Sequence, residues 1–186
     1  DEMPLVLHGS DFHSDYIRLQ RAIQLGSKMN VAANVFTGDI VSFNANDGYD
    51  AFNALFSQAE KNTINILVAG DHDNRNGYGA DEFAEKFMKT CATKWSYSNN
   101  NKSYYYKDNT EKKLRFIVID EVEGAPEYYY NVRHLQQAQA QFLVDSLAST
   151  PENYGIIICI HKPQGTAFKP ANNKFYFPHG NGDWSD

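Results

Sequence analysis

The chain has 186 residues, and 42% of them are hydrophobic, which is enough for one globular domain with a substantial core. The formal net charge of −6 argues against a broad surface for a nucleic-acid backbone, although it leaves room for a small phosphate pocket. No apolar run approaches the roughly 20 residues of a membrane span. The sequence opens at Asp1 without a signal-peptide pattern, so it does not reveal the compartment.

Strands and helices are expected to alternate through the first half of the chain. Short apolar runs predict strands at 4–7, 34–37 and 64–69. After each strand, apolar residues at near-helical spacing predict a helix, and the three helices are expected at 15–28, 49–60 and 80–91.

The second half begins with a different pattern. Residues 97–120 contain a tyrosine-rich run and an apolar run around a charged turn, which predicts a β-hairpin. A helix is expected at 135–147, followed by a buried strand at 155–160 in which Cys159 is a buried free thiol. Helices that alternate with continuously apolar strands predict an α/β fold with a largely parallel sheet.

Four segments end apolar runs with side chains that bind metals, at residues 10–13, 38–39, 70–73 and 160–163. Their aspartates and histidines suit divalent cations such as Mn²⁺, Fe or Zn²⁺. In parallel α/β sheets, ligands bind beyond the carboxyl ends of the strands, where loops far apart in sequence converge. The four segments in series therefore predict a binuclear metal site at that edge of the sheet.

Each segment also has an ordinary explanation when it is taken alone. Asp11 and His13 suit a turn with a surface histidine, and Gly38–Asp39 suits a turn or a helix cap. Residues 71–73 suit a solvated loop, and His161 suits a hydrogen-bonded histidine near the core. The order of the segments and their equivalent places at strand ends favour one metal site over four separate explanations.

In this order, the segments resemble the motifs of the calcineurin-like metallophosphoesterase superfamily. Ser-Asp-Phe-His at 10–13 matches the first motif, and Thr-Gly-Asp at 37–39 matches the second. Ala-Gly-Asp-His-Asp at 69–73 matches the third with one substitution, and Ile-His-Lys-Pro at 160–163 matches the fourth. Residues 135–143 also look like the helix that many members carry before the fourth motif. The resemblance implies a layered α/β/β/α sandwich, with residues 1–186 as a single metallophosphoesterase domain and the metal site at the carboxyl ends of the strands.

The chain departs from the superfamily pattern in two places. Asp71 stands where the third motif normally has asparagine; a carboxylate still binds metal, but it adds negative charge where a phosphate would approach. The Gly-His-x-His motif, which supplies a histidine to each metal, is absent, because His-Gly-Asn-Gly at 179–182 matches neither its order nor its spacing. We therefore expect a domain that is incomplete at its C-terminus, with true loss of the motif as the alternative.

The resemblance implies a hydrolase for phosphomonoesters or phosphodiesters that uses a binuclear metal centre and a metal-bridging hydroxide. Two divalent ions are expected, drawn from Mn, Fe, Zn and Mg. Asp39 would bridge the two ions. Asp11 and His13 would hold the first ion, and Asp71 and His161 would hold the second.

The resemblance gives His72 and Asp73 the catalytic roles. His72 would donate a proton to the leaving alkoxide or stabilise charge in the transition state, and Asp73 would orient it. Arg75 is the candidate substrate-binding residue, as a clamp on the phosphate, against the alternative of an ordinary surface arginine.

The rival hypothesis is a catalytically weakened binding or structural module on the same fold, as part of a larger protein. Asp71 and the absence of Gly-His-x-His favour this module, whereas His72 beside Asp73 favours an enzyme. In a larger assembly, the tyrosine clusters at 104–106 and 128–130 would form a binding surface, although such tyrosines more often pack on a neighbouring layer. The substrate stays open, because phosphatases, phosphodiesterases, nucleases and pyrophosphatases share these motifs.

Overall fold

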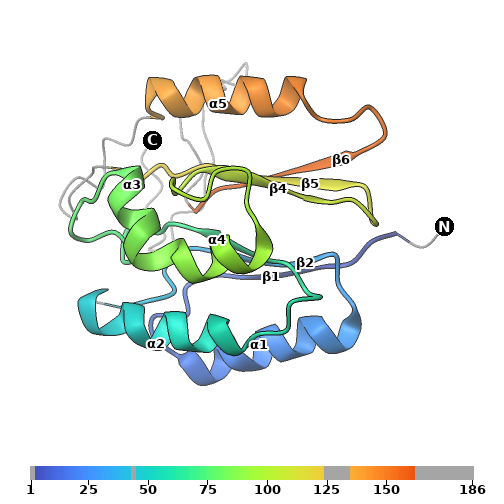
Figure 1. The fold of residues 1–186 in the computed structure, drawn as a ribbon. Coiled ribbons are helices and arrows are strands. Elements are labelled where there is room, and N and C mark those ends of the chain that lie inside the picture. The colour runs from blue at the N-terminus through green and yellow to red at the C-terminus, as the bar shows by residue number, and fades with distance from the viewer. Residues whose placement is uncertain (1–2, 43–44, 124–134, 162–186) are drawn as a thin grey trace, which may run out of the picture.

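The protein is a mixed α/β structure with two three-stranded sheets (Figure 1), as a computed structural model describes it for residues 3–42, 45–123 and 135–161. The first sheet has the order β1-β2-β3 and consists of parallel strands at Val6–Gly9, Ala33–Thr37 and Asn65–Val68. The second has the order β4-β5-β6, with strands at Tyr105–Asn109, Leu114–Val118 and Gly155–Cys159. The pair β4-β5 is the expected antiparallel hairpin, and β5-β6 is parallel.

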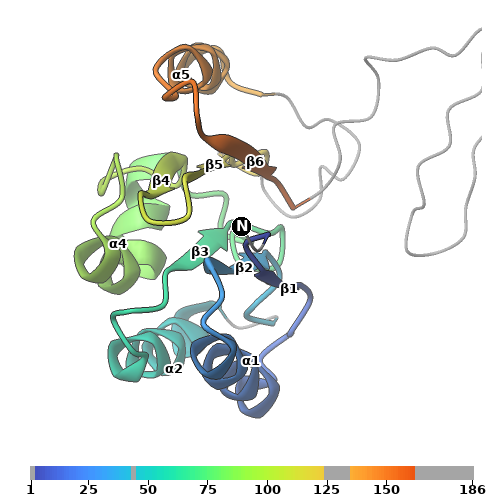
Figure 2. The same ribbon diagram turned by 90° about the vertical axis from the view of Figure 1, so that its right-hand side faces the viewer.

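Helices lie on the outer sides of both sheets (Figures 1 and 2). Helices α1 (Tyr16–Met29) and α2 (Ala45–Gln58) lie against the first sheet, and α5 (Gln137–Ala148) runs along the second. The helix expected at 80–91 continues further and changes pitch, through α3 (Ala80–Phe83), the π-helical turn η1 (Ala84–Met88) and α4 (Lys89–Trp95). Within the described part of the chain, no helix is both long and apolar enough to cross a membrane.

Helix α1 shows how local chemistry sets an element's bounds. The side chain of Asp15 accepts a hydrogen bond from the backbone N–H of Arg18, which satisfies one of the free donors in the first turn. At the other end, Asn30 adopts the left-handed conformation, with a φ of 49°, and stops the helix. Leu19 and Ile23 are buried on the inner face. The helix predicted at 15–28 is thus confirmed to within about one residue.

The core of the first sheet is largely aromatic. The rings of Phe52 and Phe87 stack with their centroids 4.1 Å apart, and Phe56 packs on Phe52 at 4.5 Å. All three side chains are fully buried. Complete burial of such a side chain contributes roughly 1.5–3 kcal/mol, so this cluster anchors α2 to the helix formed by α3, η1 and α4.

Two tyrosine side chains form hydrogen bonds with the backbone of β3, at the edge of the first sheet. The hydroxyl of Tyr105 donates to the carbonyl of Leu67 and accepts from the N–H of the same residue, both at 2.9 Å. The hydroxyl of Tyr97 donates to the carbonyl of Asn65, and its ring stacks on that of Tyr105 with the centroids 3.9 Å apart. These hydroxyls meet backbone groups that a neighbouring strand would otherwise bind, and they join the two sheets.

The first tyrosine cluster therefore packs inside the protein instead of forming a binding surface. Tyr104 and Tyr105 are buried, and the guanidinium of Arg115 lies 3.9 Å from the centre of the Tyr106 ring. The second cluster, at 128–130, lies outside the described residues.

The prediction of a buried final strand is wrong for one face of β6. Ile156 and Ile158 are 42% and 50% exposed, whereas Cys159 is buried and free, as expected. Strand β6 lies at the edge of its sheet and pairs only with β5 in the described part of the chain. On the face that Ile156 shares with Arg115 of β5, Arg115 reaches the carbonyl of Ser146 in α5 at 2.9 Å. Within the described residues, α5 therefore covers β5 on this face and leaves the isoleucines of β6 exposed.

Candidate metal centre

The loops after β1, β2, β3 and β6 converge, as their places at strand ends predicted. Backbone hydrogen bonds join the first two loops. The N–H of Asp11 donates to the carbonyl of Gly38 at 3.1 Å, and that of His13 donates to the carbonyl of Asp39 at 2.9 Å. Asp11, His13 and Asp39 have φ angles of 56°, 46° and 51°, in the left-handed region that non-glycine residues rarely adopt. Such strain costs roughly 1–3 kcal/mol per residue and clusters at functional sites.

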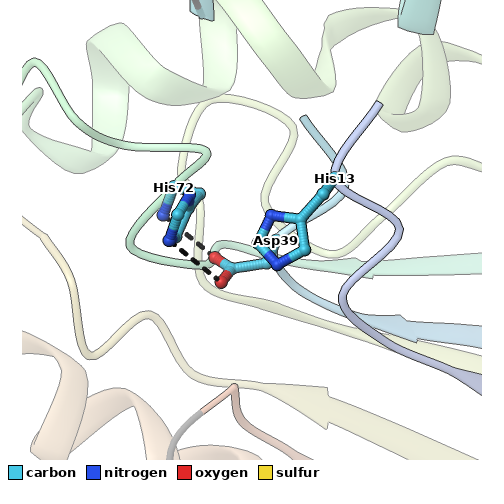
Figure 3. Close-up of side chains that lie close together, drawn as sticks. All are labelled: His13, Asp39 and His72. Atoms are coloured by element: carbon cyan, nitrogen blue, oxygen red, sulfur yellow. Dashed lines mark hydrogen bonds and ion pairs between the residues drawn. The ribbon is translucent and has the colours of Figure 1, made fainter. Parts of the chain in front are cut away.

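Asp39 lies at the centre of the site. Its buried carboxylate belongs to two groups whose potential ligand atoms lie within 4.8 Å of one another: His13, Asp39 and His72 in one, and Asp39, Asp71 and His161 in the other. The backbone N–H of His72 donates to Oδ1 of Asp39 at 2.9 Å. Figure 3 shows His72 facing this carboxylate, with His13 on a separate loop beside it.

Two glycines make room for this arrangement. A Cβ atom on Gly70 would lie 2.3 Å from both the backbone nitrogen and Oδ1 of Asp39. A Cβ on Gly38, which has a φ of 86°, would lie 2.6 Å from Nδ1 of His161. The Gly-Asp pairs in the sequence are therefore a steric requirement, because a side chain at either glycine would displace a candidate ligand.

His161 is held in the orientation of a metal ligand. Its Nδ1 lies 2.6 Å from the carbonyl of Thr37, which only accepts hydrogen bonds, so Nδ1 carries a proton. Its Nε2 then faces Oδ1 of Asp71 at 3.2 Å and Oδ1 of Asp39 at 3.4 Å. The contact of His161 with Thr37 could not be predicted from the sequence, since a backbone carbonyl leaves no side-chain signal there.

The charges of this group are strongly coupled. Burial alone would lower the pKa of His161, but hydrogen bonds and charge from Asp39 and Asp71 raise the pKa to about 11. Burial opposes ionisation of Asp39 as well, yet the contact with His161 holds the pKa of that carboxyl below its usual value. Without an ion, His161 is therefore the cation that balances the two carboxylates.

Asp73 has different partners from those we expected. Its Oδ1 accepts from the backbone N–H groups of Ile40 and Val41, at 2.9 and 2.8 Å, and its Oδ2 accepts from that of Gly70 at 3.0 Å. Burial raises the pKa of this carboxyl to about 7, against the effect of these N–H groups. Asp73 thus ties the loop after β2 to the loop after β3.

His72 instead has a basic neighbour. Nη2 of Arg75 lies 3.0 Å from Nδ1 of His72. Burial lowers the pKa of His72, and the charge of Arg75 adds to this effect, while that of Asp39 opposes it. Arg75 is half-buried, unlike an ordinary surface arginine.

Asp11 lies at the rim of the site. Its Oδ1 is 3.8 Å from Nε2 of His13, and its Oδ2 accepts a hydrogen bond from the hydroxyl of Ser10. Among the described residues, Asp11 is in neither of the two groups around Asp39. The structure thus brings together His13, Asp39, Asp71, His72 and His161, with Asp11 beside His13.

The donor set fits divalent ions. Two carboxylates and an imidazole with a hydrogen-bonded Nδ1 converge around Asp39, Asp71 and His161, and oxygen and imidazole donors are ligands for Mn²⁺, Fe and Zn²⁺. The carbonyl of Thr37 supplies the outer hydrogen bond that orients metal-binding histidines. Residues 162–186, which include His179 and the end of the fourth segment, lie outside the described residues.

Comparison with known proteins supports the fold. No protein-family model matches the chain, and no curated protein matches it. Among solved structures, the crystal structure of a dimetal phosphatase from Danio rerio is similar, with a TM-score of 0.58 and 13% identity over 88% of this chain and 71% of that chain. The two chains share a fold. The similarity supports the expected resemblance at the level of a metallophosphoesterase-like fold, and the function has to be argued from the residues of the site.

Proposed function

We propose that this protein is a metal-dependent phosphoester hydrolase with a binuclear centre. The observation that carries the proposal is the place of Asp39, which belongs to both groups of candidate ligands. A carboxylate has two oxygens and can therefore serve two ions at once. Bound divalent ions would neutralise phosphate oxygens and lower the pKa of the attacking water.

We assign the individual residues to the two ions as the resemblance implies. Asp71 and His161 would hold one ion and Asp11 and His13 the other, with Asp39 shared. The proposed arrangement is the four-layer α/β/β/α sandwich, in which the site lies across the edges of both sheets. The metals are proposed to be Mn, Fe, Zn or Mg, and the substrate a phosphomonoester or phosphodiester.

The other residues would position groups around the substrate. Nε2 of His72 lies 3.9 Å from Oδ2 of Asp39, close enough to the centre to interact with a leaving oxygen. Arg75 lies beside His72, with its Nη2 3.0 Å from Nδ1 of that ring. Asp73 would act indirectly, by holding together the loops that carry Asp39 and Asp71.

The direct test combines metal analysis with hydrolysis. We expect the purified protein to bind two divalent ions per chain, and to cleave an aryl phosphate monoester or diester with Mn²⁺ until the ions are chelated. A folded chain that binds no ion would overturn the proposal. A chain that binds ions without turnover would favour the binding module. The negative charge of Asp71 next to Asp39 is the observation that supports this alternative.

Asp71→Asn is expected to retain the metal and to increase turnover about tenfold. The amide keeps an oxygen for the ion and removes a negative charge near the approaching phosphate. Two unit charges about 4 Å apart interact by roughly 4 kcal/mol at an effective dielectric constant of about 20. The ions offset much of this, but a residual of about 1.4 kcal/mol is tenfold in rate.

The measurement is kcat for an aryl phosphate with Mn²⁺, together with the metal content of the variant. Glu152→Gln, an exposed substitution that changes the net charge equally, is the matched control. If Asp71→Asn loses activity with the metal still bound, the carboxylate has a function of its own.

Metal binding near pH 7 is expected to release about one proton per chain. His161 carries a proton in the metal-free state because its pKa is raised to about 11, and an ion at Nε2 must displace that proton. Apparent affinity should therefore rise with pH up to about that value. In the metal-free protein, the stabilisation from protonated His161 is complete below its ordinary pKa of about 6.5 and is lost as the pH rises through 11.

Titration calorimetry in buffers with different ionisation enthalpies measures the released proton. The control is His8→Gln. It changes an exposed histidine that is hydrogen-bonded to the side-chain hydroxyl of Thr37, and metal binding to this variant should release the same number of protons. No proton release at pH 7 would show that His161 is already neutral in the metal-free protein.

A further inference from the structure

Two half-buried histidines of the site, His72 and His161, contact opposite kinds of partner through Nδ1. In His161 this nitrogen faces the carbonyl of Thr37, which accepts hydrogen bonds. In His72 it faces the guanidinium of Arg75, at 3.0 Å. A guanidinium has five N–H donors and no acceptor.

This difference sets the position of the proton on each ring. Because Arg75 can only donate, Nδ1 of His72 must accept, and the proton of the neutral ring is on Nε2. In His161 the carbonyl of Thr37 holds a proton on Nδ1, so Nε2 is the nitrogen that can release its proton and offer a lone pair to a metal. The neighbours of the two histidines therefore keep a proton on opposite nitrogens, Nδ1 in His161 and Nε2 in His72.

The tautomer decides between two roles for His72. Distances alone permit a metal ligand, because His72 lies with His13 and Asp39 in one group of potential ligands. Binding through Nε2 would need a lone pair there and a proton on Nδ1, where two donors would then face each other. The same argument disfavours a fully protonated ring, which would also place an N–H against the guanidinium.

We propose that Arg75 is a positioning residue that holds His72 in the Nε2–H tautomer, so that His72 donates a hydrogen bond to the leaving oxygen of the substrate and does not bind metal. The role at the leaving oxygen rests on the proposed hydrolase function, whereas the tautomer does not. Under this assignment, Nε2 keeps its proton throughout and stabilises the charge that develops on the leaving oxygen.

Hydrogen bonds from two backbone N–H groups fix the positions of His72 and Arg75. The N–H of His72 donates to Oδ1 of Asp39, which fixes the start of the side chain over the carboxylate. The N–H of Asn74 donates to the carbonyl of Gly70 at 3.0 Å and closes the turn that brings Arg75 back towards His72. Nε2 then faces Asp39 at 3.9 Å, on the side of the ring opposite Arg75.

The decisive experiment is ¹⁵N NMR of the full chain, labelled at histidine and loaded with Mg²⁺ or Zn²⁺, because protonated and bare imidazole nitrogens differ clearly in chemical shift. The signals of His72 are identified by their loss in His72→Gln. We expect a protonated Nε2 and a bare Nδ1 for His72 in the unmodified protein. A bare Nε2, or a ring protonated at both nitrogens, would overturn the proposal without the need for any other variant.

Variants of Arg75 then separate positioning from phosphate binding. Arg75→Lys keeps a donor and should retain the tautomer, whereas Arg75→Met should shift His72 to a mixture of both tautomers. We expect Arg75→Met to lower kcat about tenfold with KM unchanged, and Arg21→Met, at an exposed position on α1, to change neither. A rise in KM with weaker inhibition by inorganic phosphate, and an unchanged tautomer, would identify Arg75 as the phosphate clamp and overturn the proposal.

The failures of the two proposals can be told apart. If the protein hydrolyses no phosphoester and His72 still has the Nε2–H tautomer that depends on Arg75, the hydrolase function fails and the positioning role of Arg75 stands. If hydrolysis occurs and His72 has a bare Nε2, the function stands and this inference fails.

Discussion

Asp39→Asn is expected to lower metal affinity at least about a hundredfold and to abolish hydrolysis. His72→Ala, by contrast, is expected to keep the bound metal and to lose only the hydrolytic activity. Asp39 belongs to both groups of candidate ligands, so its loss affects both ions. Asparagine still offers Oδ1 to the N–H of His72, and the local backbone should therefore be retained. Removing the donor of His72 should reduce kcat by about 10²–10³.

Metal content of the purified variants, measured by mass spectrometry, decides the comparison. Asp145→Asn changes an exposed carboxylate on α5 and serves as the matched control. Equal loss of metal from Asp39→Asn and His72→Ala would mean that His72 is a ligand, and the roles of the two residues would have to be exchanged.

Asp73→Asn is expected to destabilise the protein by about 2 kcal/mol, and Asp73→Ala by about 4 kcal/mol. The buried carboxylate accepts from three backbone N–H groups. Asparagine keeps one oxygen for Ile40 and Val41 but turns an amide donor towards the N–H of Gly70, while alanine leaves all three donors unsatisfied. Each unsatisfied buried donor costs about 1–3 kcal/mol.

Urea unfolding of the metal-free chain measures the difference, because bound ions would add their own stabilisation. Asp50→Asn, at an exposed position of α2, should stay within about 0.5 kcal/mol of the parent. If Asp73→Asn unfolds at the same urea concentration as the parent, the contact between the two loops does not stabilise the native state.

The sequence predicts features that depend on neighbours along the chain. The helix at 15–28, the hairpin of β4 and β5, and the metal-type side chains at strand ends all have local signals that the structure reproduces. The loops converge because parallel strands end at the same edge, which is a rule of topology and needs no coordinates.

Features that depend on tertiary neighbours could not be predicted in the same way. An apolar strand has the same residue pattern at the edge of a sheet as at its centre. The exposure of Ile156 and Ile158 therefore could not be predicted from the residue pattern. The partners of Asp73 are backbone N–H groups, which every residue except proline carries. The contact of Arg75 with His72 depends on a turn whose geometry the residue types do not specify.

The bond between His161 and the carbonyl of Thr37 also bears on how the molecule forms. It joins residues 124 positions apart, at the ends of strands in different sheets. Contacts between such distant positions form slowly, because the intervening chain must first be ordered. During synthesis the first sheet and its aspartates emerge early, while the histidine that completes their group of candidate ligands arrives only after residue 160. Ion uptake by this group would therefore mark a chain that has finished both sheets.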